Sequence, residues 1–160
     1  MKKLYFLSLI AFPLMALQSE EPLPAGFEHW TPASLQTVAE ALGTEAKGDP
    51  HHFAVKQLSD YPNESFLMVR READGQVEWH ETQIDIILVQ SGNATLVVGG
   101  KLTGAETVAP HEKRNGTIQG GARQKLSAGD VVRIPPRTPH QLLLDGAPEF
   151  TYLVIKGKSY

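Results

Sequence analysis

The 160-residue sequence contains no cysteine, so disulfide bonds and a lipid-modified cysteine anchor are excluded. It also has no apolar run of the roughly 20 residues that a membrane-spanning helix needs. The apolar run near the N-terminus extends only from Leu4 to about Ala16, and it contains Pro13. About 140 residues follow this run, which is enough chain to bury a full hydrophobic core without disulfides.

The N-terminal segment has the layout of a secretory signal peptide. Lys2 and Lys3 come first, the short apolar run follows, and the polar stretch LQSEEP comes next. We therefore expect residues 1–19 to be a signal peptide, with the cleavage point left open between Ala16 and Ser19. The mature protein would then be periplasmic or secreted. A buried N-terminal helix is the alternative.

The sequence also lacks an excess of positive charge. It has 15 basic and 18 acidic residues, and removal of Lys2 and Lys3 would leave 13 basic residues and a formal net charge of −5. A mildly acidic protein is a poor electrostatic partner for nucleic acid or an anionic membrane. We expect a small-molecule ligand, no nucleic-acid partner, and no membrane partner once the signal peptide is removed.

Only one substantial helix is expected. The lead-in from Glu20 to Pro32 contains three prolines, which disfavour a helix interior and a central strand. The stretch PASLQTVAEALG then repeats apolar residues at helical spacing, and Gly43 predicts its end. Residues 20–52 are thus assigned to lead-in and helix, and residues 53–160 to a β domain.

The β domain is indicated by short apolar stretches separated by glycine, proline, asparagine and aspartate. The pattern predicts an all-β barrel or sandwich. Hairpin turns are expected at ADG (73–75) and SGN (91–93), and further turns near residues 129–130 and 146–148. The longest irregular stretch, residues 101–123, is expected to be functional or mobile.

Polar residues interrupt two of the expected strands. Glu78 and His80 are two residues apart and therefore share one face of a strand. If ETQI forms a turn, Asp85 begins a neighbouring antiparallel strand and reaches the same face. A bend made by three prolines precedes His140 and fixes its direction.

The spacing of these residues resembles the two sequence motifs of the cupin superfamily, over roughly residues 66–155. The first motif is matched by Glu78, His80, Asp85 and Gly92, and the second by Gly129, Pro135, Arg137, His140 and Leu144. The resemblance implies a small jelly-roll barrel of two packed antiparallel sheets, with a pocket that usually surrounds a divalent metal. It also implies a homodimer, because cupins commonly dimerise through their sheets.

The match has departures. Glu78 stands where the family usually has histidine, Asp85 replaces a glutamate, Leu144 an asparagine, and Arg137 a glycine. Carried over by position, the metal ligands would be His80, His140, Glu78 and Asp85, and the ion would be Fe, Mn, Zn or Ni. Because Asp85 is one methylene shorter than glutamate, it reaches the metal either directly or only through water.

Another interpretation of the same residues needs no metal. Glu78 would pair with Arg70 or Arg133, Asp85 would stabilise its turn, and the histidines would make ordinary core hydrogen bonds.

Other polar residues are expected to lie outside the site. His111 and Glu112 lie in the long insertion and are expected in a solvated loop, with closure over the pocket as the alternative. Lys156 shares one face of the last strand with Tyr152 and Val154, and would be notable if that face points inward.

The function expected from these features is that of an exported, metal-dependent cupin enzyme. It would act on a small oxygen-rich molecule as an isomerase, a lyase or a dioxygenase. No catalytic residue is assigned. The alternatives are a non-catalytic module that binds a sugar or sugar acid, and a metal-free structural barrel.

Overall fold

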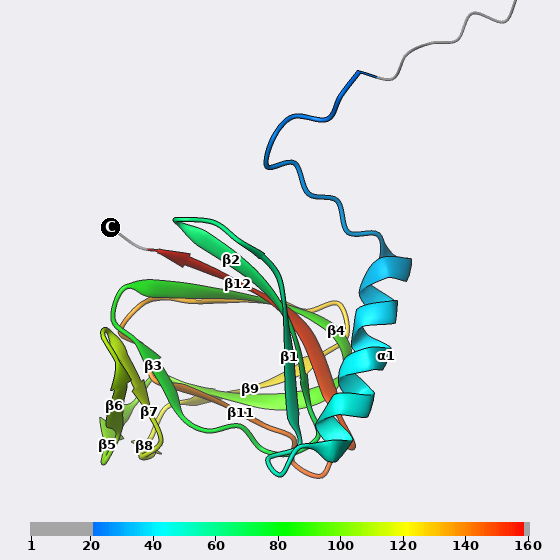
Figure 1. Ribbon diagram of the computed structural model, residues 1–160. Coiled ribbons are helices and arrows are strands. Elements are labelled where there is room, and N and C mark those ends of the chain that lie inside the picture. The colour runs from blue at the N-terminus through cyan, green and yellow to red at the C-terminus, as the bar shows by residue number, and fades with distance from the viewer. Residues whose placement is uncertain (1–20, 159–160) are drawn as a thin grey trace, which may run out of the picture.

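The computed structural model describes residues 21–158, so the expected signal peptide lies outside the described residues. An extended lead-in precedes one helix, and twelve strands follow it (Figure 1). The elements are α1 (Pro32–Gly48), β1 (Phe53–Asp60), β2 (Glu64–Arg71), β3 (Glu78–His80), β4 (Gln83–Val98), β5 (Lys101–Thr103), β6 (Glu106–Ala109), β7 (Glu112–Arg114), β8 (Thr117–Gln119), β9 (Ala122–Ser127), β10 (Val131–Ile134), β11 (His140–Leu143) and β12 (Phe150–Lys158). The predicted all-β barrel with one helix is confirmed. Within residues 21–158, no helix has the length and apolarity to cross a membrane.

Helix α1 begins where the sequence predicts, but it ends later. The Thr31 side chain accepts a hydrogen bond from the Ser34 amide, and Pro32 occupies the first turn, where its missing N–H costs nothing. The predicted stop at Gly43 is wrong, because the helix continues to Gly48. The continuation is stabilised by Ala46, which is fully buried against the outer face of the barrel.

Strand β4 joins the two sheets of the barrel. Its first half pairs with β10 and β12, and its second half pairs with β9 and β11. The hairpin turn expected at SGN is therefore wrong. Gly92 has a positive φ of 78° and bends the strand without reversing it, and the register opposite shifts between Thr151 and Tyr152. Glycine and asparagine suit such a bend as well as they suit a tight turn.

The hairpin expected at ADG is also absent. Strand β2 pairs with β1 and β12, whereas β3 pairs with β11 and β7. The connection crosses from one sheet to the other at the end of the barrel. Two hydrogen bonds fix it there: the Gly75 amide donates to the Leu142 carbonyl at 2.7 Å, and the Gln141 side chain donates to the Gly75 carbonyl at 2.8 Å.

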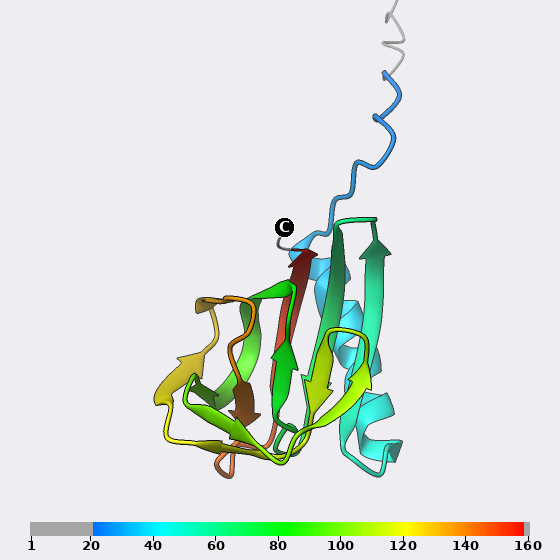
Figure 2. The same cartoon turned by 90° about the vertical axis from the view of Figure 1, so that its left-hand side faces the viewer.

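The stretch of residues 101–123 is not irregular. It forms four short strands, β5 to β8, on one side of the barrel, which faces the viewer in Figure 2. Strand β7 pairs with β3, with Arg114 opposite Glu78 and Glu112 opposite His80. This pairing brings the insertion into contact with the polar residues of β3.

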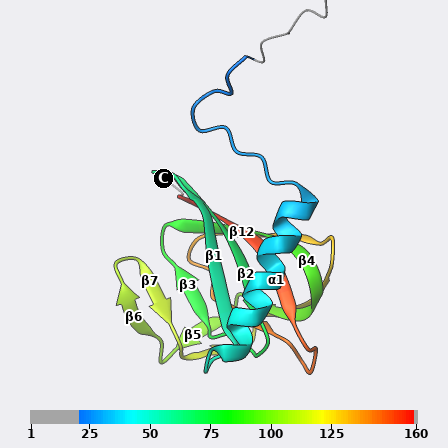
Figure 3. The ribbon, with the colours of Figure 1, turned by 45° about the vertical axis from the view of Figure 1, so that its right-hand side comes forward.

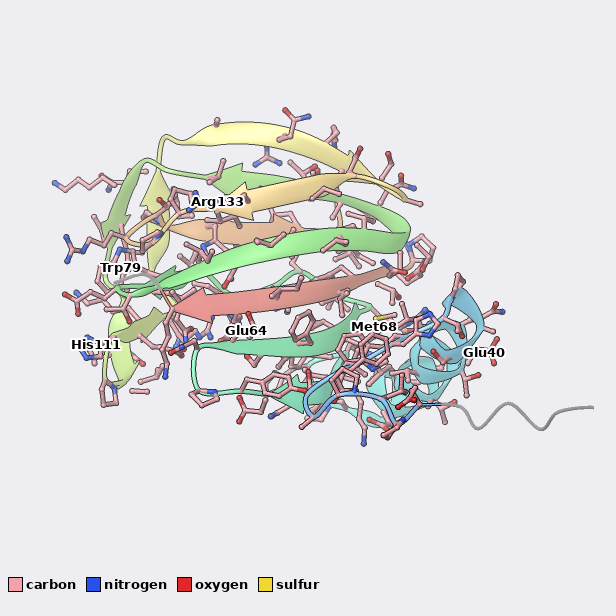
Figure 4. The ribbon with its side chains drawn as sticks, turned by 90° about the horizontal axis from the view of Figure 1, so that it is seen from above. Glu40, Glu64, Met68, Trp79, His111 and Arg133 are labelled. Carbon is pink, nitrogen blue, oxygen red and sulfur yellow. The ribbon has the colours of Figure 1, made fainter. Side chains whose placement is uncertain are left out.

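Two hydrophobic cores follow from the alternation of side chains along each strand. Along β2, Leu67 and Val69 point into the barrel, while Met68 points outward and packs against Leu42 and Ala46 of α1. Helix α1 lies along this side of the barrel (Figure 3), and Met68 lies on the side of β2 nearest to it (Figure 4). Strand β2 is apolar on both faces because the helix covers its outer one. The larger core lies inside the barrel, around the fully buried Phe150.

The bend of β4 makes Gly92 intolerant of a side chain. A Cβ added there would lie 2.1 Å from the Glu149 carbonyl oxygen, in a conformation that residues other than glycine rarely adopt. We expect Gly92→Ala to lower the free energy of unfolding by about 3 kcal/mol, measured by chemical denaturation. The matched control is Gly129→Ala, which also has a positive φ but open space around it and should cost only about 1 kcal/mol. Equal losses for both variants would contradict the steric explanation.

Candidate metal centre

The four polar residues singled out in the sequence meet at one point inside the barrel. Strand β3 supplies Glu78 and His80, β4 supplies Asp85, and β11 supplies His140. One ligand atom of each lies within 4.8 Å of the others, and all but Glu78 are fully buried. The expected route of Asp85 is wrong, because the first half of β4 does not pair with β3. Asp85 instead reaches His80 from the opposite sheet.

The separations within this cluster are those of metal ligands. Asp85 Oδ2 lies 3.4 Å from His80 Nε2 and 3.4 Å from His140 Nε2, and Glu78 Oε2 lies 3.6 Å from His80 Nε2. Good hydrogen bonds are shorter, at about 2.7–3.2 Å. Ligand atoms around a tetrahedral ion with bonds of about 2.0–2.2 Å are about 3.3–3.6 Å apart. These three pairs of donor atoms are therefore spaced to share a cation.

Both imidazoles present a suitable nitrogen to this point. Nδ1 of His140 lies 3.0 Å from the Thr138 carbonyl oxygen, which can only accept, so Nδ1 carries the hydrogen and Nε2 keeps a lone pair when the ring is neutral. Nδ1 of His80 is buried and has no hydrogen-bond partner among the described residues, and Glu112 Oε1 lies 3.5 Å from it. A carboxylate behind a histidine is typical of the outer shell of metal sites.

Lys156 also enters the cluster, because its face of β12 does point inward. It lies opposite Asp85 in the register between β12 and β4. Its Nζ donates to both Asp85 oxygens at 3.0 and 3.1 Å and lies 3.1 Å from His80 Nε2. An ammonium group thus competes for two of the lone pairs that a metal ion would use.

Two arginines hold Glu78, and neither is the partner expected from the sequence. Arg71 NH2 lies 3.1 Å from Glu78 Oε1, and Arg114 NH1 forms a close ion pair with Oε2. Arg70 instead pairs with Glu72 and Glu149, and Arg133 is exposed on β10 (Figure 4).

Two further contacts complete the surroundings of the cluster. Arg71 donates to the Tyr152 hydroxyl at 3.2 Å, and Arg114 donates to Glu112 at 3.3 Å. Glu112 is half-buried against the cluster, so its expected place in a solvated loop is wrong, whereas His111 is exposed and pairs with Glu81.

These charges determine the protonation of the buried groups. Burial opposes ionisation of Asp85, but the nearby imidazoles of His140 and His80 and the charge of Lys156 outweigh it, and its pKa lies far below the ordinary range. The same balance, with Arg114 contributing, lowers the pKa of Glu78. Burial and Lys156 oppose protonation of His80, but the two carboxylates outweigh them and raise its pKa. Both carboxylates are therefore anionic and able to bind a cation.

The donor set fits a divalent ion on one condition. Asp85 can keep Lys156 on Oδ1, but Lys156 must leave both Asp85 Oδ2 and His80 Nε2 before an ion can bind these two atoms. Lysine has a long flexible stem, so this movement is small. Two imidazoles and two carboxylates suit Fe, Mn, Zn or Ni.

The cluster lines a cavity of about 650 Å³ inside the barrel. The residues that border the cavity include Glu78, Asp85, His140, Lys156, Arg71, Arg114 and Tyr152. A small molecule in this cavity would touch the cluster directly.

No family model matches the sequence, and a comparison with curated proteins gives no match either. Solved structures do share the architecture. The cupin domain of Cnp3 from Schizosaccharomyces pombe aligns with a TM-score of 0.51 at 10% identity, over 67% of this chain and 65% of that one. The fold is that of the cupins. The chain thus spans slightly less than two thirds of that cupin domain.

Two further solved structures resemble it. TT1209 from Thermus thermophilus aligns with a TM-score of 0.51 at 14% identity, over 70% of this chain and 89% of that one. An uncharacterized protein with a double-stranded β-helix domain from Klebsiella pneumoniae aligns with a TM-score of 0.50 at 15% identity, over 67% and 77%. At these identities the likeness establishes the cupin fold alone.

Arg71 and Arg114 were not predicted to surround Glu78, and Glu112 was placed near the pocket only as an alternative. Arg71 could have been predicted, because it follows Leu67 and Val69 at alternate positions of β2 and therefore shares their inward face. Arg114 and Glu112 had no such signal, since their position depends on β7 pairing with β3 across an insertion.

Removing the ammonium group should strengthen metal binding. Lys156→Met removes a positive charge that lies about 3 Å from the ligand atoms. This charge competes with a metal ion for those atoms and repels the ion. We expect the affinity for Zn²⁺ to rise at least about tenfold, measured by competition with a chromogenic chelator. Lys158→Met, on the same strand but exposed, is the control and should leave the affinity unchanged. A weaker affinity in Lys156→Met would show that the lysine helps to hold the ion.

Proposed function

We propose that this protein binds one divalent metal ion through His80, His140, Asp85 and Glu78, and that it acts on an oxygen group of a small molecule in the barrel. The observation that carries the proposal is the spacing of 3.4–3.6 Å between the donor atoms of three ligand pairs. Asp85 is central to the site because it reaches both histidines, whereas Glu78 is shared with Arg71 and Arg114.

The chain's own residues would orient a ligand and move a proton. A bound ion would supply Lewis acidity toward the ligand oxygen. Lys156 faces the cavity with three donor hydrogens and can donate one to a developing oxyanion. Arg71, held by Tyr152 and Glu78, presents a fixed positive charge beside the same point. Isomerisation, lyase chemistry and dioxygenation of a small oxygen-bearing molecule all suit this arrangement.

A metal-free ligand-binding barrel is the second candidate. The observation in its favour is that Lys156 already satisfies Asp85 and contacts His80 Nε2. The two candidates differ in metal content and in nothing else that the site requires.

Elemental analysis of protein purified without a metal-affinity tag decides between them. We expect about one transition-metal ion per chain after reconstitution, and loss of nearly all of it in His80→Ala and in His140→Ala, because each removes a direct ligand. Asp85→Ala should lose it as well. Only traces of metal in the wild type would favour the metal-free barrel.

Two variants control this experiment. His111→Ala removes an exposed histidine outside the cluster and should keep the full metal content. Glu112→Gln changes the group behind His80, which also pairs with Arg114, and should weaken metal binding by about tenfold or more without abolishing it. Complete loss in His111→Ala would indicate that the metal binds at the surface instead.

Export and dimer formation are further parts of the proposal. The signal-peptide layout of residues 1–19 supports export to the periplasm or beyond, and the cupin fold supports a homodimer. Mass spectrometry of protein from the periplasm or medium should give a chain that starts between residues 17 and 20. Light scattering should give twice the mass of that chain. A full-length N-terminus, or a monomer, would contradict the respective part.

A further inference from the structure

The cavity has two chemically different walls. The cluster of charged residues forms one of them. The other is apolar and is built by Val55 of β1, Leu67 and Val69 of β2, Ile87 of β4 and Val154 of β12. Val55 is 44% exposed, although the pattern of β1 turns it toward the cavity, so the apolar wall extends to the opening.

The apolar wall indicates what the body of a ligand is made of. A polyhydroxylated ligand would lay its hydroxyl groups against five aliphatic side chains and lose the hydrogen bonds that water gives them. A hydrocarbon or aryl body would instead be removed from water on contact with the same side chains, which is favourable. The cavity of about 650 Å³ has room for such a body beside the cluster.

The charged wall indicates what the head of the ligand carries. Three positive and three negative groups pair with one another on this wall. The positive groups are Arg71, Arg114 and Lys156, and the negative groups are Glu78, Asp85 and Glu112. This network has no net charge when the histidines are neutral. A divalent ion would add two positive charges to a largely buried site, and an anionic ligand would offset one of them.

Arg71 is placed to receive that anion. Its guanidinium borders the cavity, held by Tyr152 and Glu78, and it packs over the ring of Phe53 at 4.6 Å. A Cβ on Gly75 would lie only 3.1–3.2 Å from it, so the glycine makes room for the group. A planar guanidinium next to a metal ion is well matched to a carboxylate.

We propose that the ligand of this cavity is a small monocarboxylate with an apolar body. Its carboxylate lies against Arg71 and the metal centre, and its hydrocarbon or aryl part lies against Val55, Leu67 and Val69. The inference rests on the proposed metal site for the charge of the head. It departs from the oxygen-rich or sugar-acid ligand expected from the sequence.

Three small molecules test the carboxylate head and the apolar body of the ligand separately. Isothermal titration calorimetry on zinc-reconstituted protein would compare 4-phenylbutyrate, 4-phenylbutan-1-ol and D-gluconate. The alcohol keeps the body and loses the charge, and gluconate keeps the carboxylate on a polar body. We expect 4-phenylbutyrate to bind at least about tenfold more tightly than either of the other two. Gluconate binding as tightly as phenylbutyrate would overturn the apolar body, and equal binding of acid and alcohol would overturn the anionic head.

A matched pair of variants locates the site. Val55→Glu places a negative charge on the apolar wall at the cavity opening, and should weaken 4-phenylbutyrate binding at least about tenfold. Val131→Glu makes the same change at a valine that is 66% exposed and does not line the cavity, and should have no effect. Equal effects of the two variants would overturn the placement of the body.

Zinc content measured on the same samples separates this inference from the proposed function. Full zinc content without preference for phenylbutyrate overturns the inference and leaves the metal site standing. No zinc uptake by the wild type overturns the proposed function and the anionic head together. The apolar body is then still tested by comparing the affinities for 4-phenylbutan-1-ol and D-gluconate.

Discussion

The ion pair between Lys156 and Asp85 is the interaction on which the interior of this barrel depends. Both groups lie deep in the barrel, Asp85 almost fully buried, and a buried charge is tolerated only with a partner. The pair couples β12 to β4, but it leaves Asp85 Oδ2 close to two imidazoles and His80 close to a second carboxylate. That carboxylate, Glu78, in turn requires Arg71 and Arg114. The polar interior is thus one connected network in which each charge is stabilised by the next.

The long strand β4 explains how the network is assembled from both sheets. Because the strand bends at Gly92 and continues, its first half carries Asp85 in one sheet while its second half pairs with β11, which carries His140. A hairpin at this position would have reversed the chain and kept both halves in one sheet. The bend therefore places a carboxylate and an imidazole on facing walls.

Much of this arrangement could be predicted from the sequence, and the limits have physical reasons. Alternation along single strands gave the barrel, the shared face of Glu78 and His80, and the shared face of Tyr152 and Lys156. The resemblance to the two cupin motifs placed His140 in the same site. The hairpin turns predicted at SGN and ADG were wrong, because glycine occurs in strand bends and in crossover connections as well as in hairpins. The partners of Glu78 were missed because strand pairing over long separations leaves no local pattern.

Strand β7 contributes to the network differently from the barrel strands. It pairs only with β3 and β6 among the described residues, and no core residue of the barrel comes from it. Arg114 and Glu112 therefore contribute charge around Glu78 and His80 without being part of the hydrophobic core. Related chains with the same barrel could differ in the charge around the centre, and so in the ions and ligands they accept, through this short segment alone. The insertion sets the charge around the centre, whereas the hydrophobic core of the barrel is formed by other strands.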